Sequence, residues 1–246
     1  MQDVNPPEPG IYLVATPIGN MEDITLRALR ILRSADILAC EDTRVTRKLF
    51  ERHGLAAPRM IFSCHDHNER MVAKRLADLA LSGSTVACCS DAGMPGISDP
   101  GFHIVREALG AGVKLEAIPG PNAMVTAATL SGLAGGAFTF FGFPSRRDGR
   151  LRSLLRRHGR LEPALVFHES PRRLARLLTL AAEIAGGGRR AAICFELTKK
   201  YERVIRGSLE QLAGNFGAGG TRGEAVVVIE GNRKNDSDAA DCGNEA

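Results

Sequence analysis

The sequence predicts an α/β protein of two domains, with a mainly parallel sheet in the first and a mixed sheet in the second. A chain of 246 residues has room for two domains of about 100–120 residues each. In the first half, short apolar runs alternate with amphipathic segments, which is typical of βαβ units. In the second half, the apolar runs at residues 190–197 and 201–207 follow one another without a helix between them, which indicates antiparallel pairs.

The elements of the first domain follow from the spacing of its apolar residues. Ile24, Ala28 and Ile31 recur at helical spacing, whereas runs such as residues 85–90 are continuously apolar and bounded by turn residues. Strands are predicted over residues 11–16, 36–40, 59–63, 85–90 and 113–118. Helices are predicted near residues 24–35, 43–53, 68–82 and 101–111.

Pro119-Gly120-Pro121 interrupts this pattern and predicts a domain boundary at residues 117–121. The first domain then spans residues 11–118 and the second residues 119–231. In the second, helices are predicted near residues 122–132, 146–158, 171–185 and 208–214, and strands over 137–143, 164–169, 190–197, 201–207 and 224–231. Residues 1–10 form an N-terminal extension. Residues 232–246 are polar and aperiodic, which predicts a disordered tail.

The composition excludes several classes of protein. Hydrophobic residues make up 44% of the chain and charged residues 24%, as in ordinary soluble globular proteins. No apolar stretch approaches the roughly 20 residues of a transmembrane helix, and residues 1–10 are polar and proline-rich, so no secretory signal is expected. The six cysteines form no CxxC pair, so a reducing cytoplasm without membrane attachment is expected.

Glycine, proline and small polar residues fill the segments that follow the predicted strands of the first domain. In open α/β sheets, ligands bind beyond the carboxyl ends of the strands. The segments are residues 15–20, 41–44, 90–101 and 119–122. Neither a GxxxxGK[ST] phosphate loop nor a GxGxxG dinucleotide fingerprint is present. Any one segment could be a plain surface turn, but four at successive strand ends favour a ligand site.

Residues 90–101 indicate what kind of ligand this is. They contain three glycines and two aspartates but neither lysine nor arginine, so they suit a pyrophosphate poorly. Carboxylates and carbonyls suit a ligand with hydroxyls or a cationic centre, such as a ribose or a sulfonium. His65 and His67 could suggest a metal, but no second cluster completes such a site. A turn with Asp66 or His67 near a helix N-cap is the preferred interpretation, and no metal is expected.

Positive charge is concentrated in the second half of the chain. Residues 1–120 carry a net charge of −2 and residues 121–231 a net charge of +8. The stretch from Ser145 to Arg160 contains seven arginines against one acid, Asp148. A solvated helix face is the alternative, but the imbalance favours contact with phosphates. The arginines expected to contact the phosphates of a polyanionic partner are Arg146, Arg147, Arg150, Arg152, Arg156 and Arg157.

The motifs ATPIGN, EDTR, CHDHNE, SDAGMPGISDPG, IPGPNA, FHESPRRL and ELTKKYERVIRG occur in this order along the chain. In combination they resemble the tetrapyrrole-methylase superfamily over about residues 11–230. Within it, the chain is similar to the enzymes that methylate the 2′-hydroxyl of cytidine 1402 in 16S ribosomal RNA. Two departures are CHDHNE, where an aromatic residue more often precedes HEHNE, and SPRRL, where SPHRL is more usual.

The resemblance implies two α/β domains with S-adenosylmethionine bound in the cleft between them, a homodimer, and the small ribosomal subunit as partner. Carried over by motif, the cofactor contacts are Pro17, Asp91, Ala92, Gly93, Ile97, Ser98, Asn122, Ala123, Glu169 and Thr198. Positioning the hydroxyl in line with the methyl group is much of the catalysis, and a base could take its proton. Glu41 and Asp42 are the first candidates for that base and His65 the second.

Two other functions remain open at this point. Methylation of a tetrapyrrole carbon is the other main chemistry of the superfamily, although a small macrocycle does not call for seven clustered arginines. A non-catalytic RNA-binding module is the third interpretation, but it would not need the acidic segment at residues 90–101.

Overall fold

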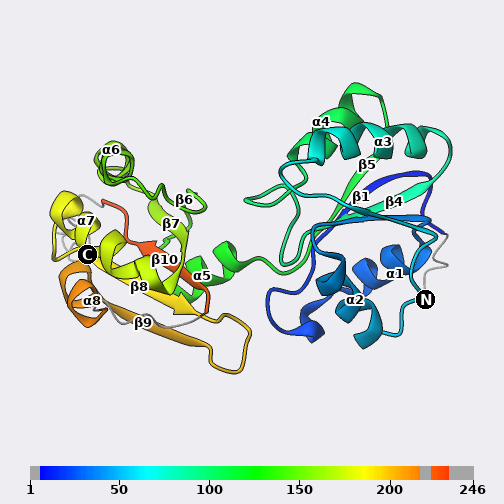
Figure 1. Ribbon diagram of the computed structural model, residues 1–246. Helices are drawn as coiled ribbons and strands as arrows, with labels where there is room; N and C mark the ends of the chain where they lie inside the picture. The colour runs from blue at the N-terminus through cyan, green and yellow to red at the C-terminus, as the bar shows by residue number, and fades with distance from the viewer. Residues whose placement is uncertain (1–5, 217–222, 233–246) are drawn as a thin grey trace, which may run out of the picture. The chain divides into compact units, whose positions relative to one another are not determined.

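The computed structural model describes residues 6–216 and 223–232 (Figure 1). The chain divides into two compact units, Met1–Asn122 and Ala123–Ala246. Residues 1–5 of the predicted extension and residues 233–246 of the predicted tail lie outside the described residues. Among the helices of the described residues, none combines the length and the apolar character that crossing a membrane requires.

The first unit is built on a five-stranded parallel sheet, as the sequence predicts. The strands lie in the order β3-β2-β4-β1-β5, and every neighbouring pair is parallel. Their bounds are β1 Gly10–Val14, β2 Ile37–Cys40, β3 Met60–Ser63, β4 Thr85–Cys89 and β5 Leu115–Ile118. The inner strands β1, β2 and β4 are buried along their whole length, which explains their continuous apolar sequences.

Helices cover both faces of this sheet (Figure 1). They are α1 Leu26–Ser34, α2 Thr43–Arg52, α3 Glu69–Leu81 and α4 Phe102–Gly110, with a short 3₁₀ helix, η1, at Met21–Asp23. Side chains alternate along β1: Tyr12 packs in the core under α1 and α2, whereas Leu13 packs in the core under α3 and α4. Both cores lie beneath the segments that follow the strands, so those segments rest on a rigid support.

The second unit contains a mixed sheet in the order β6-β7-β10-β8-β9. Only β6 and β7 are parallel, and the other neighbouring pairs are antiparallel, which confirms the predicted mixed sheet. The bounds are β6 Phe138–Phe140, β7 Ala164–Glu169, β8 Arg190–Phe195, β9 Arg203–Ser208 and β10 Ala225–Ile229. The central strand β10 is buried throughout and joins the two halves of the sheet.

Helices α6, α7 and α8 pack on one face of the second sheet, where Phe167, Phe195 and Val227 meet Leu151 of α6 and Leu177 of α7. Helix α5 packs against β7, β10 and β8 on the other face. The bounds are α5 Ala123–Ser131, α6 Asp148–His158, α7 Leu174–Ala185 and α8 Leu209–Asn215, with a 3₁₀ helix, η2, at Pro171–Arg173.

Candidate functional site

The segments that follow the strands of the first sheet are bonded to one another at its carboxyl edge. Thr16 and Gly93 exchange two backbone hydrogen bonds of 2.9 and 3.0 Å, which join the segments after β1 and β4. The backbone N–H of Asp42 donates to Oδ1 of Asp91 over 2.9 Å and adds the segment after β2. The parallel sheet therefore brings together three of the four segments that the sequence singles out.

Backbone geometry shapes residues 90–101. Gly93 and Gly96 adopt φ values of 84° and 85°, which favour glycine. At Gly101, a Cβ atom would lie 2.6 Å from the nitrogen of Gly96, so only glycine fits there. The N–H of Gly96 donates to the carbonyl of Pro100 over 3.0 Å and closes the turn between them. The backbone of this segment is thereby fixed without long side chains in the way of a ligand.

A buried carboxylate that the sequence does not single out holds the end of the same segment. Glu69, in the first turn of α3, is only 5% exposed. Its Oε1 atom accepts hydrogen bonds from the backbone N–H groups of Gly101 and His103, over 2.8 and 2.7 Å. These N–H groups begin α4, so Glu69 caps that helix and fixes where residues 90–101 end.

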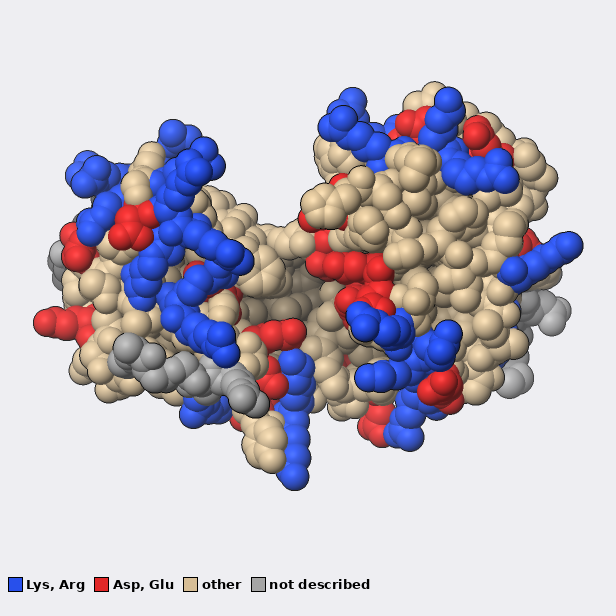
Figure 2. Space-filling model, in the orientation of Figure 1, with Lys and Arg blue, Asp and Glu red and all other residues tan. Residues whose placement is uncertain are grey.

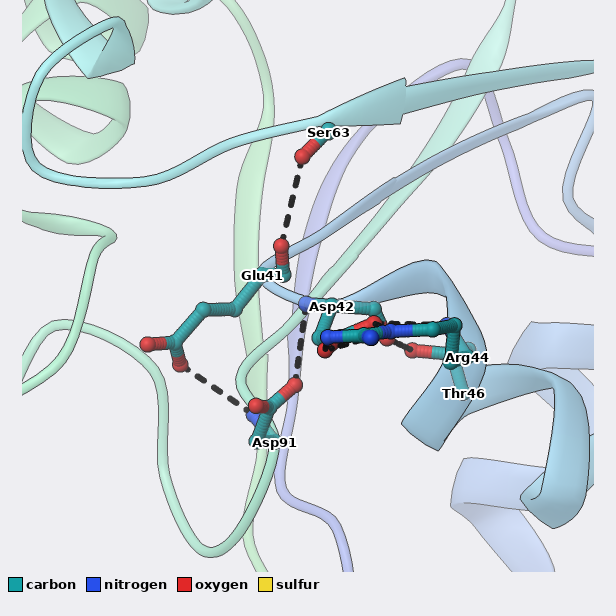
Figure 3. A network of polar contacts seen from close by, with 6 residues as sticks. All are labelled: Glu41, Asp42, Arg44, Thr46, Ser63 and Asp91. Atoms are coloured by element: carbon teal, nitrogen blue, oxygen red, sulfur yellow. Dashed lines mark hydrogen bonds and ion pairs between the residues drawn. The ribbon is translucent and has the colours of Figure 1, made fainter.

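Three carboxyl groups at this edge have raised pKa values. Burial raises the pKa of Asp99 to about 6, and the neighbouring Glu41 carboxylate adds to the effect. Burial also raises the pKa of Glu41 and of Asp91. The N–H of Asp91 donates to Oε2 of Glu41 over 3.4 Å (Figure 3). A cationic ligand would favour the ionised forms, so this cluster suits a positive centre.

Asp42 has a different environment from Glu41 (Figure 3). Its side chain is the N-cap of α2, accepting from the N–H of Arg44 over 2.8 Å, and it pairs with the Arg44 guanidinium at 2.6 Å. Hydrogen bonds from Arg44 lower the pKa of Asp42 to about 2. A group that is committed to a helix cap and binds protons weakly is a poor base, so the geometry favours Glu41 of the two.

The turn around His65 is arranged by Asn68. Asn68 is the N-cap residue of α3, so Asp66 and His67 lie near the N-cap, as the sequence predicts. Its Oδ1 atom accepts from the N–H of His65 over 2.8 Å, and its Nδ2 donates to the carbonyl of Ser63. An amide can make both bonds at once, which a carboxylate cannot. The ring of His65 is exposed and packs edge-to-face with His67.

Across residues 6–216 and 223–232, no group of three His, Cys, Asp or Glu residues could hold a metal ion.

The remaining cofactor candidates of the first unit lie in these joined segments, except Asn122, which lies in the fourth segment at residues 119–122. Pro17 follows Thr16 directly, and Ala92 precedes Gly93. Ile97 is 47% exposed, and Ser98 adopts a positive φ of 65°, which is uncommon for a residue with a side chain. Asn122 is the last residue of the first unit.

In the second unit, Glu169 and Thr198 bring buried polar atoms to one edge of the sheet. Glu169, at the end of β7, pairs in register with Ala225, which in turn pairs with Phe195 at the end of β8. The Oε1 atom of Glu169 accepts from the N–H of Ser170 and from Arg173, over 2.7 and 2.5 Å. Its Oε2 atom is buried and has no hydrogen-bond partner among the described residues.

Thr198 has a similar unsatisfied atom. It lies beyond β8 with a positive φ of 65°, and its Oγ1 is buried without a partner in the described part of the chain. Buried polar atoms are nearly always hydrogen-bonded in folded proteins. Two unpaired oxygens at one sheet edge therefore suit a ligand that carries N–H or O–H donors. Ala123, the last of the cofactor candidates, begins α5.

Helix α6 presents most of its arginines to solvent. Figure 2 shows the blue side chains gathered over α6 and beside α7. Asp148 pairs with Arg176 of α7 at 2.6 Å, so the acid of this stretch is already neutralised. Arg152 pairs with Glu183 of α7, also at 2.6 Å, and is therefore less available than the others. The exposed arginines are Arg146, Arg147, Arg150, Arg156, Arg157 and Arg160.

Comparison with known proteins identifies the family to which this fold belongs. A model of the family described as tetrapyrrole (corrin/porphyrin) methylases matches residues 10–213. The chain belongs to the tetrapyrrole methylase family. Among these methylases, it is 46% identical to a protein of Mesorhizobium japonicum over 91% of this chain and 76% of that protein. It is 39% identical to a protein of Bacillus subtilis over 93% of this chain and 77% of that protein. Both relatives are named ribosomal RNA small subunit methyltransferase I.

Solved structures of tetrapyrrole methylases share the fold at lower sequence identity. The methyltransferase CobJ matches with a TM-score of 0.66 and 19% identity, covering 90% of this chain and 94% of that one. Uroporphyrin-III C-methyltransferase from Thermus thermophilus, complexed with S-adenosyl homocysteine, matches with a TM-score of 0.62 and 21% identity. That match covers 90% of this chain and 97% of the other. At these identities the likeness establishes the fold, as the sequence predicts.

Proposed function

We propose that this protein transfers a methyl group from S-adenosylmethionine to the ribose 2′-hydroxyl of cytidine 1402 in the RNA of the small ribosomal subunit. The observation that carries the proposal is the level of similarity to relatives named for that subunit's RNA, 39–46% identity over at least 90% of the chain. The ribose position and the nucleotide come from the motif resemblance. A cytoplasmic homodimer is the expected state.

The residues at the two sheet edges fit the proposed cofactor. S-adenosylmethionine supplies an activated methyl group on a positively charged sulfur. Asp91 and Asp99 would provide the compensating negative charge in the first unit. Their pKa values are raised, and a bound cation would lower them and so favour the ionised carboxylates. In the second unit, the unpaired Oε2 of Glu169 and Oγ1 of Thr198 would accept hydrogen bonds from amino or hydroxyl groups.

Glu41 is the proposed base. It follows β2 at the edge where Asp91 also lies, and the N–H of Asp91 orients its carboxylate. Its raised pKa, caused by burial, makes it a better proton acceptor than an ordinary carboxylate. The chain's contribution to catalysis is then to orient the acceptor hydroxyl and to receive its proton at a carboxylate oxygen.

The arginines of α6 are proposed to bind phosphates of the RNA. A groove of about 430 Å³ between α6 and α7 adds to this surface, with Arg152, Arg156, Arg160 and Glu183 among its lining residues. Arginine binds phosphate oxygens through two parallel N–H groups, and Arg156 and Arg160 are the arginines of this groove that could do so, since Glu183 already pairs with Arg152. The acids near α6 are already paired, which leaves its outer face positive.

Methylation of a tetrapyrrole carbon is the alternative that the fold itself raises. The solved tetrapyrrole methyltransferases are only 16–23% identical to this chain, well below the identity to the ribosomal RNA methyltransferases. The carboxylates of a macrocycle would need a few cations, not an exposed row of arginines on one helix. The positive face of α6 therefore favours a polyanionic acceptor.

The test uses small ribosomal subunits from a strain that lacks this methylation, incubated with the protein and methyl-labelled S-adenosylmethionine. Nuclease digestion and mass spectrometry of the nucleosides should recover label as 2′-O-methylcytidine. Label on a base carbon, or transfer only to a tetrapyrrole supplied in parallel, would overturn the proposal. Binding of RNA without any transfer would instead support a non-catalytic module.

A further inference from the structure

An aromatic group that the proposed function does not use includes Phe143, which lies five residues before the start of the arginine-rich helix α6. The ring of His168, on β7, packs edge-to-face with the rings of both Phe140 and Phe143. The ring centroids are 4.9 and 5.4 Å apart, with interplanar angles of 67° and 79°. Such edge-to-face pairs have preferred geometry, so each ring helps to fix its neighbour.

Phe143 is exposed because the chain turns just before it. The N–H of His168 donates to the carbonyl of Gly142 over 2.9 Å, which extends the pairing of β6 and β7 to this point. Gly142 then adopts a φ of 60°, a left-handed conformation that ends the strand. The side chain that follows is 59% exposed although it is a large aromatic. Phe143 therefore stands at the end of the sheet with its ring available to a ligand.

The aromatic group is uncharged, and charges of both signs lie near it: Glu224 acts electrostatically on His168, and two arginines follow Phe143 in the chain. Burial lowers the pKa of His168, so its ring is neutral at neutral pH. The Nε2 atom of that ring is buried and has no hydrogen-bond partner among the described residues, so a ligand's donor or acceptor would satisfy it. Arg146 and Arg147, both exposed, follow Phe143 in the chain and lead into α6.

We infer that Phe143, held by His168, is a stacking platform for an unpaired nucleobase of the acceptor RNA. An exposed aromatic ring beside arginines is the arrangement by which proteins hold single-stranded nucleic acid: the ring stacks on a base and the cations contact the backbone. The inference rests on the proposed RNA substrate. A second copy of this chain is disfavoured as occupant, because it would bring its own arginines against these.

The chain contains no tryptophan, so Phe143→Trp introduces a single indole at the position where stacking is expected. Adding a single-stranded oligoribonucleotide should quench its fluorescence to saturation, and adding inorganic polyphosphate should not. Phe102→Trp is a matched control. Phe102 is 57% exposed, packs edge-to-face with His103 at 5.4 Å and has Arg106 nearby, but lies on α4 of the first unit. Its fluorescence should not change with RNA.

Removing the ring provides a second measurement. Phe143→Ala should weaken binding of the oligoribonucleotide by about 5- to 100-fold, because the stacking of one base is removed. The slope of log affinity against log salt should stay as in the wild type, since every phosphate-binding arginine is still present. Arg147→Gln should show the opposite pattern, with a flatter slope.

Several results would overturn the inference. They are equal quenching by RNA and polyphosphate, equal quenching of the Phe102→Trp control, and an unchanged RNA affinity for Phe143→Ala. A dimer that dissociates in Phe143→Ala during sedimentation, with RNA affinity intact, would assign the ring to a subunit contact and would also overturn it. Failure of the proposed function is separate, because wild-type protein would then not methylate subunits, whatever the indole reports.

Discussion

The backbone N–H of Asp42 donates a hydrogen bond to Oδ1 of Asp91 across 2.9 Å, although the two residues follow different strands. The N–H of Asp91 in turn donates to Oε2 of Glu41, the residue before Asp42. The segments after β2 and β4 therefore hold each other through reciprocal contacts. The backbone N–H of Asp91 therefore positions Glu41, the proposed base, while its carboxylate is the proposed contact of the positively charged cofactor.

Asp91→Ala should weaken binding of S-adenosylmethionine by about tenfold or more, because it removes a charged acceptor and the bridge to Asp42 together. Asp91→Asn keeps an oxygen for the bridge but loses the charge, so its affinity should lie between those of Asp91→Ala and the wild type. Titration calorimetry measures both variants. Wild-type affinity in Asp91→Ala would remove this residue from the cofactor site.

Gly93→Ala should lose cofactor affinity through the backbone. Gly93 has a φ of 84° and contacts the segment after β1, and an added Cβ would approach Ile18 at 3.6 Å. Gly83→Ala is the matched control, since Gly83 also has a positive φ, 96°, with open space around it. Both variants should lose about 1 kcal/mol of stability from strain. Only Gly93→Ala should bind S-adenosylmethionine more weakly, and equal affinities in calorimetry would contradict the placement.

Glu41→Gln should lower kcat of methyl transfer by about 100-fold or more with cofactor affinity little changed. In the wild type, kcat should rise with pH through the raised pKa of Glu41 and then level off, because the base must be ionised. Glu41→Gln should lack that rise. Asp42→Asn keeps a capping oxygen for α2 and should retain most of the activity. If Asp42→Asn is the slower enzyme in single-turnover assays, Asp42 is the base instead.

Asp99→Asn should stabilise the folded protein at neutral pH. The folded-state pKa of Asp99 is about 6, above the ordinary 3.8, so the folded protein holds this proton more tightly than the unfolded chain does. Stability is therefore lost as pH rises from about 4 to 6, and the neutral amide avoids that loss. The gain should be on the order of 1 kcal/mol, reduced by partial exposure.

Urea unfolding at acidic and neutral pH measures this effect. The difference between Asp99→Asn and the wild type should grow from low pH to neutral pH and then stay constant. Asp78→Asn is the control, because Asp78 lies exposed on α3. An equal gain in both variants, or a gain that is largest at acidic pH, would show that the Asp99 carboxyl is not the cause.

Arg150→Gln combined with Arg157→Gln should weaken binding to small ribosomal subunits and flatten its salt dependence. The two arginines are exposed on one face of α6, about two turns apart. For each phosphate that is no longer bound, the slope of log affinity against log salt should decrease by about 0.7–0.9. Arg152→Gln should have less effect, because Glu183 already occupies Arg152. A slope identical to wild type in the double variant would mean that this face is merely solvated.

The sheets could be predicted because strands that are buried on both faces have continuously apolar sequences. The inner strands of the first unit are buried on both faces and are apolar without interruption, as in residues 85–89. Once the strands are parallel, their carboxyl ends must share an edge, so the position of the segments after them follows. The mixed sheet is indicated by β8 and β9, which follow each other without a helix between them.

The ends of the elements depend on turns that apolar patterns do not reveal. The predicted strand 137–143 is shortened to Phe138–Phe140, because the chain turns left-handed at Gly142. The predicted strand 190–197 stops at Phe195, since Glu196 and Thr198 both have positive φ values. A non-glycine residue in that conformation is too uncommon to be expected from a single sequence.

The contacts of the candidate site were the least predictable part. Glu69 has the position of an ordinary acid in the first turn of a helix, and nothing local shows that its carboxylate caps α4 instead. The Asp42–Asp91 bond and the raised pKa of Asp99 likewise arise from residues that are distant in the sequence. Motif resemblance could identify Glu169, but not which of its oxygens stays unpaired.

The position of β10 has a consequence for synthesis of the chain. This strand is the last in the described residues, yet it lies between β7 and β8 and bonds to both. A nascent chain that has emerged only as far as β9 leaves β7 and β8 without their shared neighbour, with unpaired backbone groups along both. The first unit pairs strands from its own residues and can fold early, whereas the second must wait for its centre. Translational pausing before residue 225 would therefore expose an aggregation-prone intermediate of the second unit alone.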